Sequence, residues 1–171
     1  MTSNLPLNFL VDKEKNQIHI SKTFAADLPL TWDVWTKPEY LDQWWAPKPY
    51  RTETKSMDFR PGGRWFYAMI SPTDERHWCI ADYKTIAPQV QVTYADSFAD
   101  ENGALNAAFG STHWTVDFST TGDGDTTQVS LLGQYESLDL LEKVIEVGFQ
   151  QGFSAAIANL DELLASLNNN A

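Results

Sequence analysis

One change in the spacing of apolar residues, near residue 136, restricts the fold of this chain of 171 residues more than any other feature. Between residues 50 and 135, apolar and polar side chains alternate with a period of two, which is typical of strands that bury one face. Ser137 is a good N-cap, and from there to Leu167 apolar residues recur at steps of three and four, which predicts one long amphipathic helix. A one-faced sheet and a one-faced helix must cover each other, so we expect an α+β domain.

Turn residues divide the alternating segment into six strands. A run such as Pro61-Gly62-Gly63 favours a tight turn, because proline fixes its own φ and glycine accepts positive φ. An earlier strand at 17–25 places Ile18, Ile20 and Phe24 on one side, so seven strands are predicted in all. The six later strands span approximately residues 50–60, 63–71, 76–86, 89–98, 109–119 and 126–135.

Two short helices are predicted after the first strand. Asp27 can accept the free N–H groups of a helix that contains Pro29 in its first turn and ends at Thr36. Pro38 opens a second helix, which Pro47 should end.

No linker or repeat divides the chain, and its composition indicates a cytoplasmic protein. We expect an extended lead-in at 1–15, one domain at 16–168 and a tail at 169–171. The net charge of −11 disfavours nucleic acid and anionic membrane surfaces as partners. Cys79 is the only cysteine, which suits a reducing compartment. No signal peptide or membrane span is predicted, and no metal or other cofactor either, because no two histidines have ligand spacing.

Several motifs spread along the chain resemble one known family. They comprise Ile18 to Phe24, Pro29, Val34-Trp35, Thr36-Lys37-Pro38-Glu39, Gln43-Trp44-Trp45-Ala46-Pro47, Asp58-Phe59-Arg60-Pro61-Gly62-Gly63-Arg64-Trp65, Tyr83-Lys84-Thr85-Ile86-Ala87-Pro88, and the glycines Gly148 and Gly152. The pattern resembles the family named after the activator of the heat-shock-protein-90 ATPase, in its short bacterial single-domain form. That family lies in the SRPBCC or helix-grip superfamily, with START lipid-transfer domains and the birch pollen allergen.

The resemblance implies a helix-grip fold. In that fold a curved seven-stranded antiparallel sheet carries two short helices after its first strand, and the long C-terminal helix crosses the concave face. This chain departs from the family pattern at Lys22, where arginine is usual, and at Ala81, where glycine is usual. Both differences could reshape the space between sheet and helix. The family has diverse functions, so the fold does not settle the chemistry.

Binding of a small, mostly apolar or aromatic molecule between sheet and helix is the leading hypothesis. The chain has many large aromatic residues, and those on the inner face of the strands would enclose a flat or extended ligand. Gly148 and Gly152 lie on one face of the helix, where they permit either close packing or a bound molecule. The predicted ligand-binding residues are Trp45, Met57, Phe59, Trp65, Tyr67, Met69, Tyr83, Tyr94, Trp114, Gly148, Phe149, Gly152 and Phe153.

Two other functions stay open at this point. A cyclase, dehydratase or hydrolase acting on such a ligand would need His77 or Tyr83 in the cavity beside a charged group, although no known catalytic motif is present. An adaptor related to chaperone co-factors would show a solvent-facing tryptophan patch around Trp44. The sequence leaves open the ligand, whether the cavity is filled, and whether the chain forms a homodimer.

Overall fold

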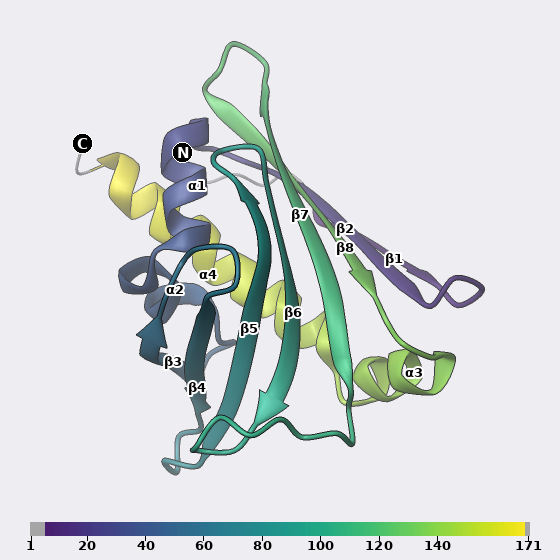
Figure 1. The fold of residues 1–171 in the computed structure, drawn as a ribbon. Coiled ribbons are helices and arrows are strands. Elements are labelled where there is room, and N and C mark those ends of the chain that lie inside the picture. Colours follow the sequence, from purple (N-terminus) through teal and green to yellow (C-terminus); the bar gives the residue numbers. More distant parts are fainter. Residues whose placement is uncertain (1–5, 170–171) are drawn as a thin grey trace.

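The computed structural model describes residues 6–169, which form an α+β fold built on one antiparallel sheet that does not close into a barrel. The eight strands follow the spatial order β1-β2-β8-β7-β6-β5-β4-β3 (Figure 1). All six strands predicted between residues 50 and 135 are present, as β3 to β8. The strands are β1 (Asn8–Asp12), β2 (Gln17–Phe24), β3 (Arg51–Met57), β4 (Arg64–Ile70), β5 (Arg76–Ala87), β6 (Gln91–Ala99), β7 (Ser111–Thr121) and β8 (Thr126–Gln134).

The expectation of seven strands was wrong, because the segment predicted as a lead-in contains β1. Its register pairs Phe9 with Ile20 and Val11 with Ile18, along the edge of β2 that β8 leaves free. Asn16, at a φ of 57°, allows the chain to turn sharply between the two strands. Residues 1–5 of the lead-in and residues 170–171 of the tail lie outside the described part of the chain.

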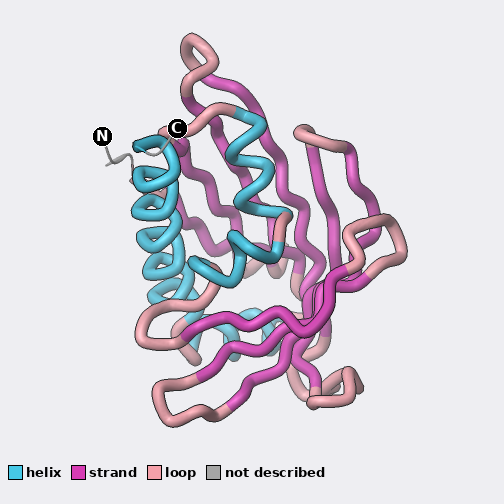
Figure 2. The backbone as a smooth tube through the Cα atoms, turned by 90° about the vertical axis from the view of Figure 1, so that its left-hand side faces the viewer, coloured by secondary structure: helices cyan, strands magenta, loops and turns pink. Residues whose placement is uncertain are grey.

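Two helices, α1 (Leu28–Thr36) and α2 (Pro38–Trp44), follow β2 as the sequence predicts. The Asp27 side chain caps α1 by accepting a hydrogen bond from the backbone N–H of Leu30 at 3.0 Å. The helices gather on one side of the sheet, whose strands bend around them (Figure 2). Helix α4 (Phe149–Asn169) runs diagonally across this inner face.

The C-terminal helix is broken, which corrects the expectation of one continuous helix. Helix α3 (Leu138–Glu146) begins at the predicted cap Ser137 and ends before Gly148, after which α4 begins. Gly148 has a φ of +94°, a left-handed conformation in which a side chain is strained. The apolar spacing continues through the break, so the residue pattern alone does not reveal it.

The main core lies between the inner face of the sheet and the helices. Ile18 and Phe24 of β2, Leu41 of α2, and Leu160 and Leu164 of α4 are at most 2% exposed. This packing seals the end of the sheet that faces the C-terminal half of α4.

Candidate ligand-binding cavity

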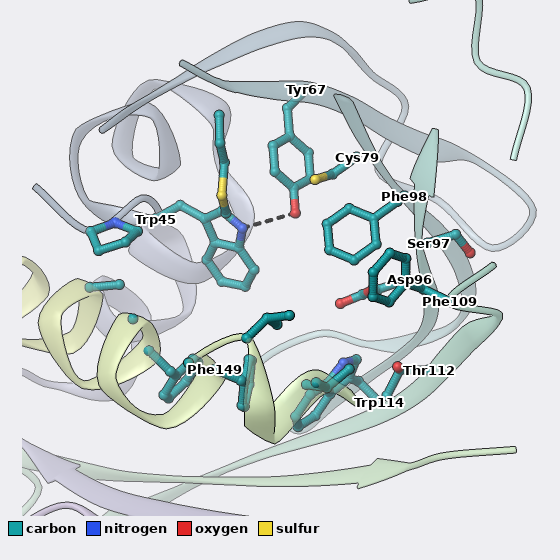
Figure 3. Close-up of a pocket in the computed structure, with 18 of the residues that line it drawn as sticks. Trp45, Tyr67, Cys79, Asp96, Ser97, Phe98, Phe109, Thr112, Trp114 and Phe149 are labelled. Atoms are coloured by element: carbon teal, nitrogen blue, oxygen red, sulfur yellow. Dashed lines mark hydrogen bonds between the residues drawn. The ribbon is translucent and has the colours of Figure 1, made fainter. Parts of the chain in front are cut away.

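A cavity of about 320 Å³ lies between the sheet and the N-terminal half of α4. Its sheet wall is formed by inward-facing residues of four neighbouring strands, β4 to β7. The register places Tyr67 opposite Cys79, Cys79 opposite Phe98, and Asp96 opposite Thr112. Figure 3 shows these side chains around a common space.

The helix wall follows from residue spacing along α4. Phe149, Gly152, Phe153 and Ala156 recur at steps of three and four, so they face the same side and line the cavity. A Cβ atom added at Gly152 would meet only the Cγ atom of Pro47, at 3.8 Å. Gly152 therefore clears space for the cavity.

Trp114 lies flat over a glycine at the base of the cavity. It pairs with Gly133 across β7 and β8, and a Cβ atom at Gly133 would lie 2.8 Å from the indole ring. Only glycine permits this approach. The Trp114 ring also lies 5.9 Å from that of Phe149, measured between centroids, so the sheet and helix walls meet there.

Two further pairs of aromatic residues close the sides of the cavity. The indole N–H of Trp45 donates a hydrogen bond to the Tyr67 hydroxyl at 3.0 Å, which fixes both side chains in the wall (Figure 3). Phe98 and Phe109, with centroids 5.1 Å apart, join the end of β6 to the loop before β7.

Asp96 places a carboxyl group in this mostly apolar wall. Burial raises its pKa from the ordinary range to about 7, and a side-chain hydrogen bond from Trp114 partly offsets that rise. Sequence reasoning missed Asp96. The available signal was its position two residues after Tyr94, which places it on the same face of β6.

The other ionisable groups near Asp96 are neutral at physiological pH. Burial raises the pKa of the Cys79 thiol to about 12 and that of the Tyr67 hydroxyl well above its usual range. A thiol with this pKa is a poor nucleophile. Within residues 6–169, no group of three or more histidine, cysteine or acidic side chains is placed to hold a metal ion.

Comparison with models of known protein families identifies the family of this chain. The model described as "Activator of Hsp90 ATPase homolog 1-like protein" matches residues 25–165. The chain belongs to this family. Its fold is the helix-grip fold that the sequence motifs predicted, with one more strand than expected.

Solved bacterial structures share this fold over nearly the whole chain. A crystal structure of a Mycobacterium smegmatis protein is 28% identical, with a TM-score of 0.84, and the match covers 93% of this chain and 97% of that one. A solution structure from Arthrobacter aurescens is also 28% identical, with a TM-score of 0.86 and coverage of 93% and 91%. One from Staphylococcus epidermidis is 25% identical, with a TM-score of 0.80 and coverage of 91% and 93%.

No curated protein matches the chain. Across residues 6–169, no helix combines the length and the apolar character needed to cross a membrane.

The structure brings many of the predicted ligand-binding residues together around the cavity. Those that line it are Trp45, Tyr67, Met69, Trp114, Gly148, Phe149, Gly152 and Phe153. The lining also includes residues that the sequence did not single out, among them Cys79, Asp96, Phe98, Phe109, Thr112 and Tyr135.

The remaining predicted residues lie elsewhere. Trp65 forms a layer behind the wall, stacked on Tyr67 with ring centroids 3.9 Å apart. Met57 and Phe59 border a separate depression beside α1. Tyr83 is buried between the rings of Phe59 and Tyr94, outside the cavity lining. Met57, Trp65, Tyr83 and Tyr94 lie on strands β3 to β6 outside the cavity lining, and Phe59 lies beyond the end of β3, which is shorter than the strand predicted at 50–60.

The histidines do not reach the cavity. His77 is exposed on β5 and lies beside the ring of Tyr50, with centroids 6.1 Å apart. His19 and His113 are exposed, as their strand faces predict. Neither His77 nor Tyr83 thus contributes to the lining.

The predicted tryptophan patch is absent from the described surface around α2. Trp44 is 1% exposed, and its indole N–H donates to the backbone carbonyl of Val34 at 2.8 Å. Trp45 is half-buried in the cavity wall.

Proposed function

We propose that this protein binds a small, mostly apolar or aromatic molecule in the cavity between the sheet and α4, and that it does so in the cytoplasm. The observation that carries the proposal is the cavity of about 320 Å³, lined by aromatic side chains from both walls. Ligand pockets in proteins span roughly 300–1,000 Å³ and combine apolar walls with a few polar groups. The cavity has both properties.

The unfilled volume beside Gly152 supports this function. A core at ordinary packing density leaves few voids larger than a water molecule. Here the chain places Gly152 where a larger apolar side chain would fill the gap. Rings that border the space would regain van der Waals contacts and lose contact with water when an apolar molecule enters. Proteins of this family fold commonly bind ligands, which agrees with the proposal.

The two alternative functions have less support. The enzyme hypothesis relied on His77 or Tyr83, and neither lines the cavity. The adaptor hypothesis relied on exposed tryptophan, and Trp44 is buried. A reaction in the cavity would have to use Asp96 as the acid or base, because the nearby Cys79 thiol is not activated as a nucleophile.

Filling the cavity provides the sharpest test. Gly152→Leu directs a side chain into the space from within α4, while Ala158→Leu adds the same side chain at an exposed position of the same helix. An apolar fluorescent dye such as N-phenyl-1-naphthylamine would be titrated into each protein. We expect Gly152→Leu to lower dye affinity by about tenfold or more, because occupied volume excludes the dye, and Ala158→Leu to leave it unchanged.

Native mass spectrometry of the protein purified from cells would identify any retained molecule. Equal dye binding by the two variants would place the dye elsewhere, and absence of binding to the wild type would overturn the proposed function. Light scattering on the same samples would test the homodimer that the sequence leaves open.

A further inference from the structure

The cavity has one charged side chain and no basic residue to neutralise it. Among the residues of the described chain that line the space, Asp96 is the only acid and there is no lysine, arginine or histidine. Figure 3 shows the Asp96 carboxylate directed into the cavity, in the region bounded by Phe98, Phe109 and Trp114. A negative charge in an apolar enclosure is unfavourable unless a donor or a cation meets it.

One side-chain hydrogen bond to this carboxylate is identified among the described residues. An ionised carboxyl group has two oxygens with about four acceptor sites, and the side-chain donor identified for Asp96 is the Trp114 indole N–H. Thr112, which pairs with Asp96 across β6 and β7, is buried in the same wall, and its side chain forms a hydrogen bond with Tyr135. A ligand with N–H donors would occupy the remaining acceptor sites of the carboxylate.

The rings around Asp96 favour the same kind of ligand. Trp45, Trp114, Phe98, Phe109 and Phe149 enclose the space from several sides. The faces of aromatic rings carry negative electrostatic potential, so they attract ammonium groups, and desolvation strengthens that attraction. An acidic ligand would instead meet both Asp96 and these ring faces with like charge.

Among the described groups that interact electrostatically with one another here, Asp96 has the pKa nearest neutrality. Four other ionisable side chains interact electrostatically with Asp96: Tyr67 on β4, Cys79 on β5, Tyr94 on β6 and Tyr135 after β8. Burial raises the pKa of each. The wall from α3 and α4 contributes only uncharged residues, such as Val144 and Phe149. The charge of the site therefore depends on Asp96.

We propose that the molecule bound in the cavity is an aromatic or apolar amine, whose protonated nitrogen pairs with the Asp96 carboxylate while its apolar part contacts the surrounding rings. This inference rests on the proposed binding function and specifies its ligand class. The overall charge of −11 would further attract cations.

Three probes with the same ring and similar length separate charge from shape. Tryptamine carries an ammonium group, 3-propylindole an uncharged methyl group in its place, and indole-3-propionate a carboxylate. Calorimetric titration at pH 8 should show tryptamine binding about tenfold or more tighter than 3-propylindole, since a hydrogen-bonded charge pair exceeds a methyl contact. Indole-3-propionate should bind weakest.

Removing the charge should weaken the binding of tryptamine and of neither other probe. Asp96→Asn keeps the side-chain shape, so we expect tryptamine affinity to fall about tenfold while 3-propylindole affinity stays constant. Asp125→Asn removes the same charge from an exposed turn and is the matched control, with no expected effect on either probe.

The wild type provides a second test that needs no substitution. The pKa of Asp96 is raised to about 7, so the carboxyl group takes up a proton below that pH while the tryptamine amine stays charged. Tryptamine affinity should fall as the pH decreases from 8 to 5, 3-propylindole affinity should not, and Asp96→Asn should abolish the dependence.

Each outcome separates the two proposals. Tryptamine binding no tighter than 3-propylindole, or unaffected by Asp96→Asn, would overturn the amine proposal and leave the binding function intact. Dye binding without binding of any indole probe would also reject the amine proposal. Failure of the dye and all three probes to bind would reject both.

Discussion

The two halves of α4 cover the same sheet but differ in how tightly they pack against it. In the C-terminal half, Leu160 and Leu164 are at most 2% exposed and pack into a filled core. In the N-terminal half, Phe149 and Phe153 remain half-buried beside a cavity. Asn159, between the two halves, donates to the backbone carbonyl of Ala46 at 3.0 Å and fixes the helix against the end of α2. One rigid element therefore packs into the core along one half and borders the cavity along the other.

Two half-buried acids differ between the two halves in the same way. Beside the packed half, Asp161 forms an ion pair with Lys22 of β2, with the Nζ and Oδ2 atoms 3.5 Å apart. Beside the cavity, Asp96 has no basic residue among the described lining. Burial raises the pKa of both carboxyl groups, but only that of Asp161 is lowered again by a lysine. The protein neutralises one acid with its own lysine and places no described basic residue beside the other, which is the acid that our proposal pairs with an amine.

The largest expected effect comes from truncating a side chain in the packed half. Leu160→Ala should lower the free energy of unfolding by about 2–5 kcal/mol, because it leaves a void among groups that cannot collapse into it. Phe153→Ala should cost less, because its ring already borders empty space. Urea denaturation followed by fluorescence measures both. Equal losses would show that the two halves are packed alike, contrary to the comparison.

A smaller effect is expected from the ion pair. Lys22→Met removes the cation and leaves Asp161 poorly solvated, which should lower stability at pH 7 by about 1–3 kcal/mol. Without lysine the pKa of Asp161 rises further, so the folded state binds a proton more readily than the unfolded chain. The lost stability should therefore be largely restored near pH 4 and reappear as the pH rises.

Two substitutions check the origin of that effect. Lys22→Arg keeps the charge and should retain most of the stability at pH 7. Asp96→Asn should change stability with the opposite sign, because it removes a charge that the protein does not pair with a base. A Lys22→Met loss that does not vary between pH 4 and pH 7 would mean that packing of the lysine chain, and not its charge, is what matters.

Sequence periodicity predicted the elements well because local rules determine them. Alternation and turn residues located β3 to β8, and the side chains of Asp27 and Ser137 cap α1 and α3 as expected. Strand β1 was missed because it has five residues and lies at the sheet edge, where its pairing with β2 and not its own pattern defines it. Pairing with a neighbouring strand is invisible to a periodicity argument, even when the two strands form a hairpin.

The site was harder to predict because alternation identifies a face and not a position along a curved sheet. Trp65 and Tyr67 share a face of β4, but only Tyr67 reaches the cavity. Phe109 enters the wall from a loop, whose path depends on closure between β6 and β7. Asp96 lies on the same face of β6 as Tyr94 by alternation. The role of an acid on an apolar face, however, can be inferred only when its neighbours are known.

The smallest expected effect concerns the two glycines that the sequence presented as equivalent. Gly152 lies within α4 with room for a methyl group, so Gly152→Ala should stabilise the protein by about 0.5–1 kcal/mol through reduced backbone entropy of the unfolded chain. Gly148→Ala should instead destabilise it by about 1–2 kcal/mol, because its φ of +94° brings a Cβ atom into steric conflict with the backbone. Thermal denaturation of the two variants would measure opposite shifts. Stabilisation by both substitutions would mean that residues 138–169 form one continuous helix in solution, and the division of the C-terminal segment at Gly148 would then be wrong.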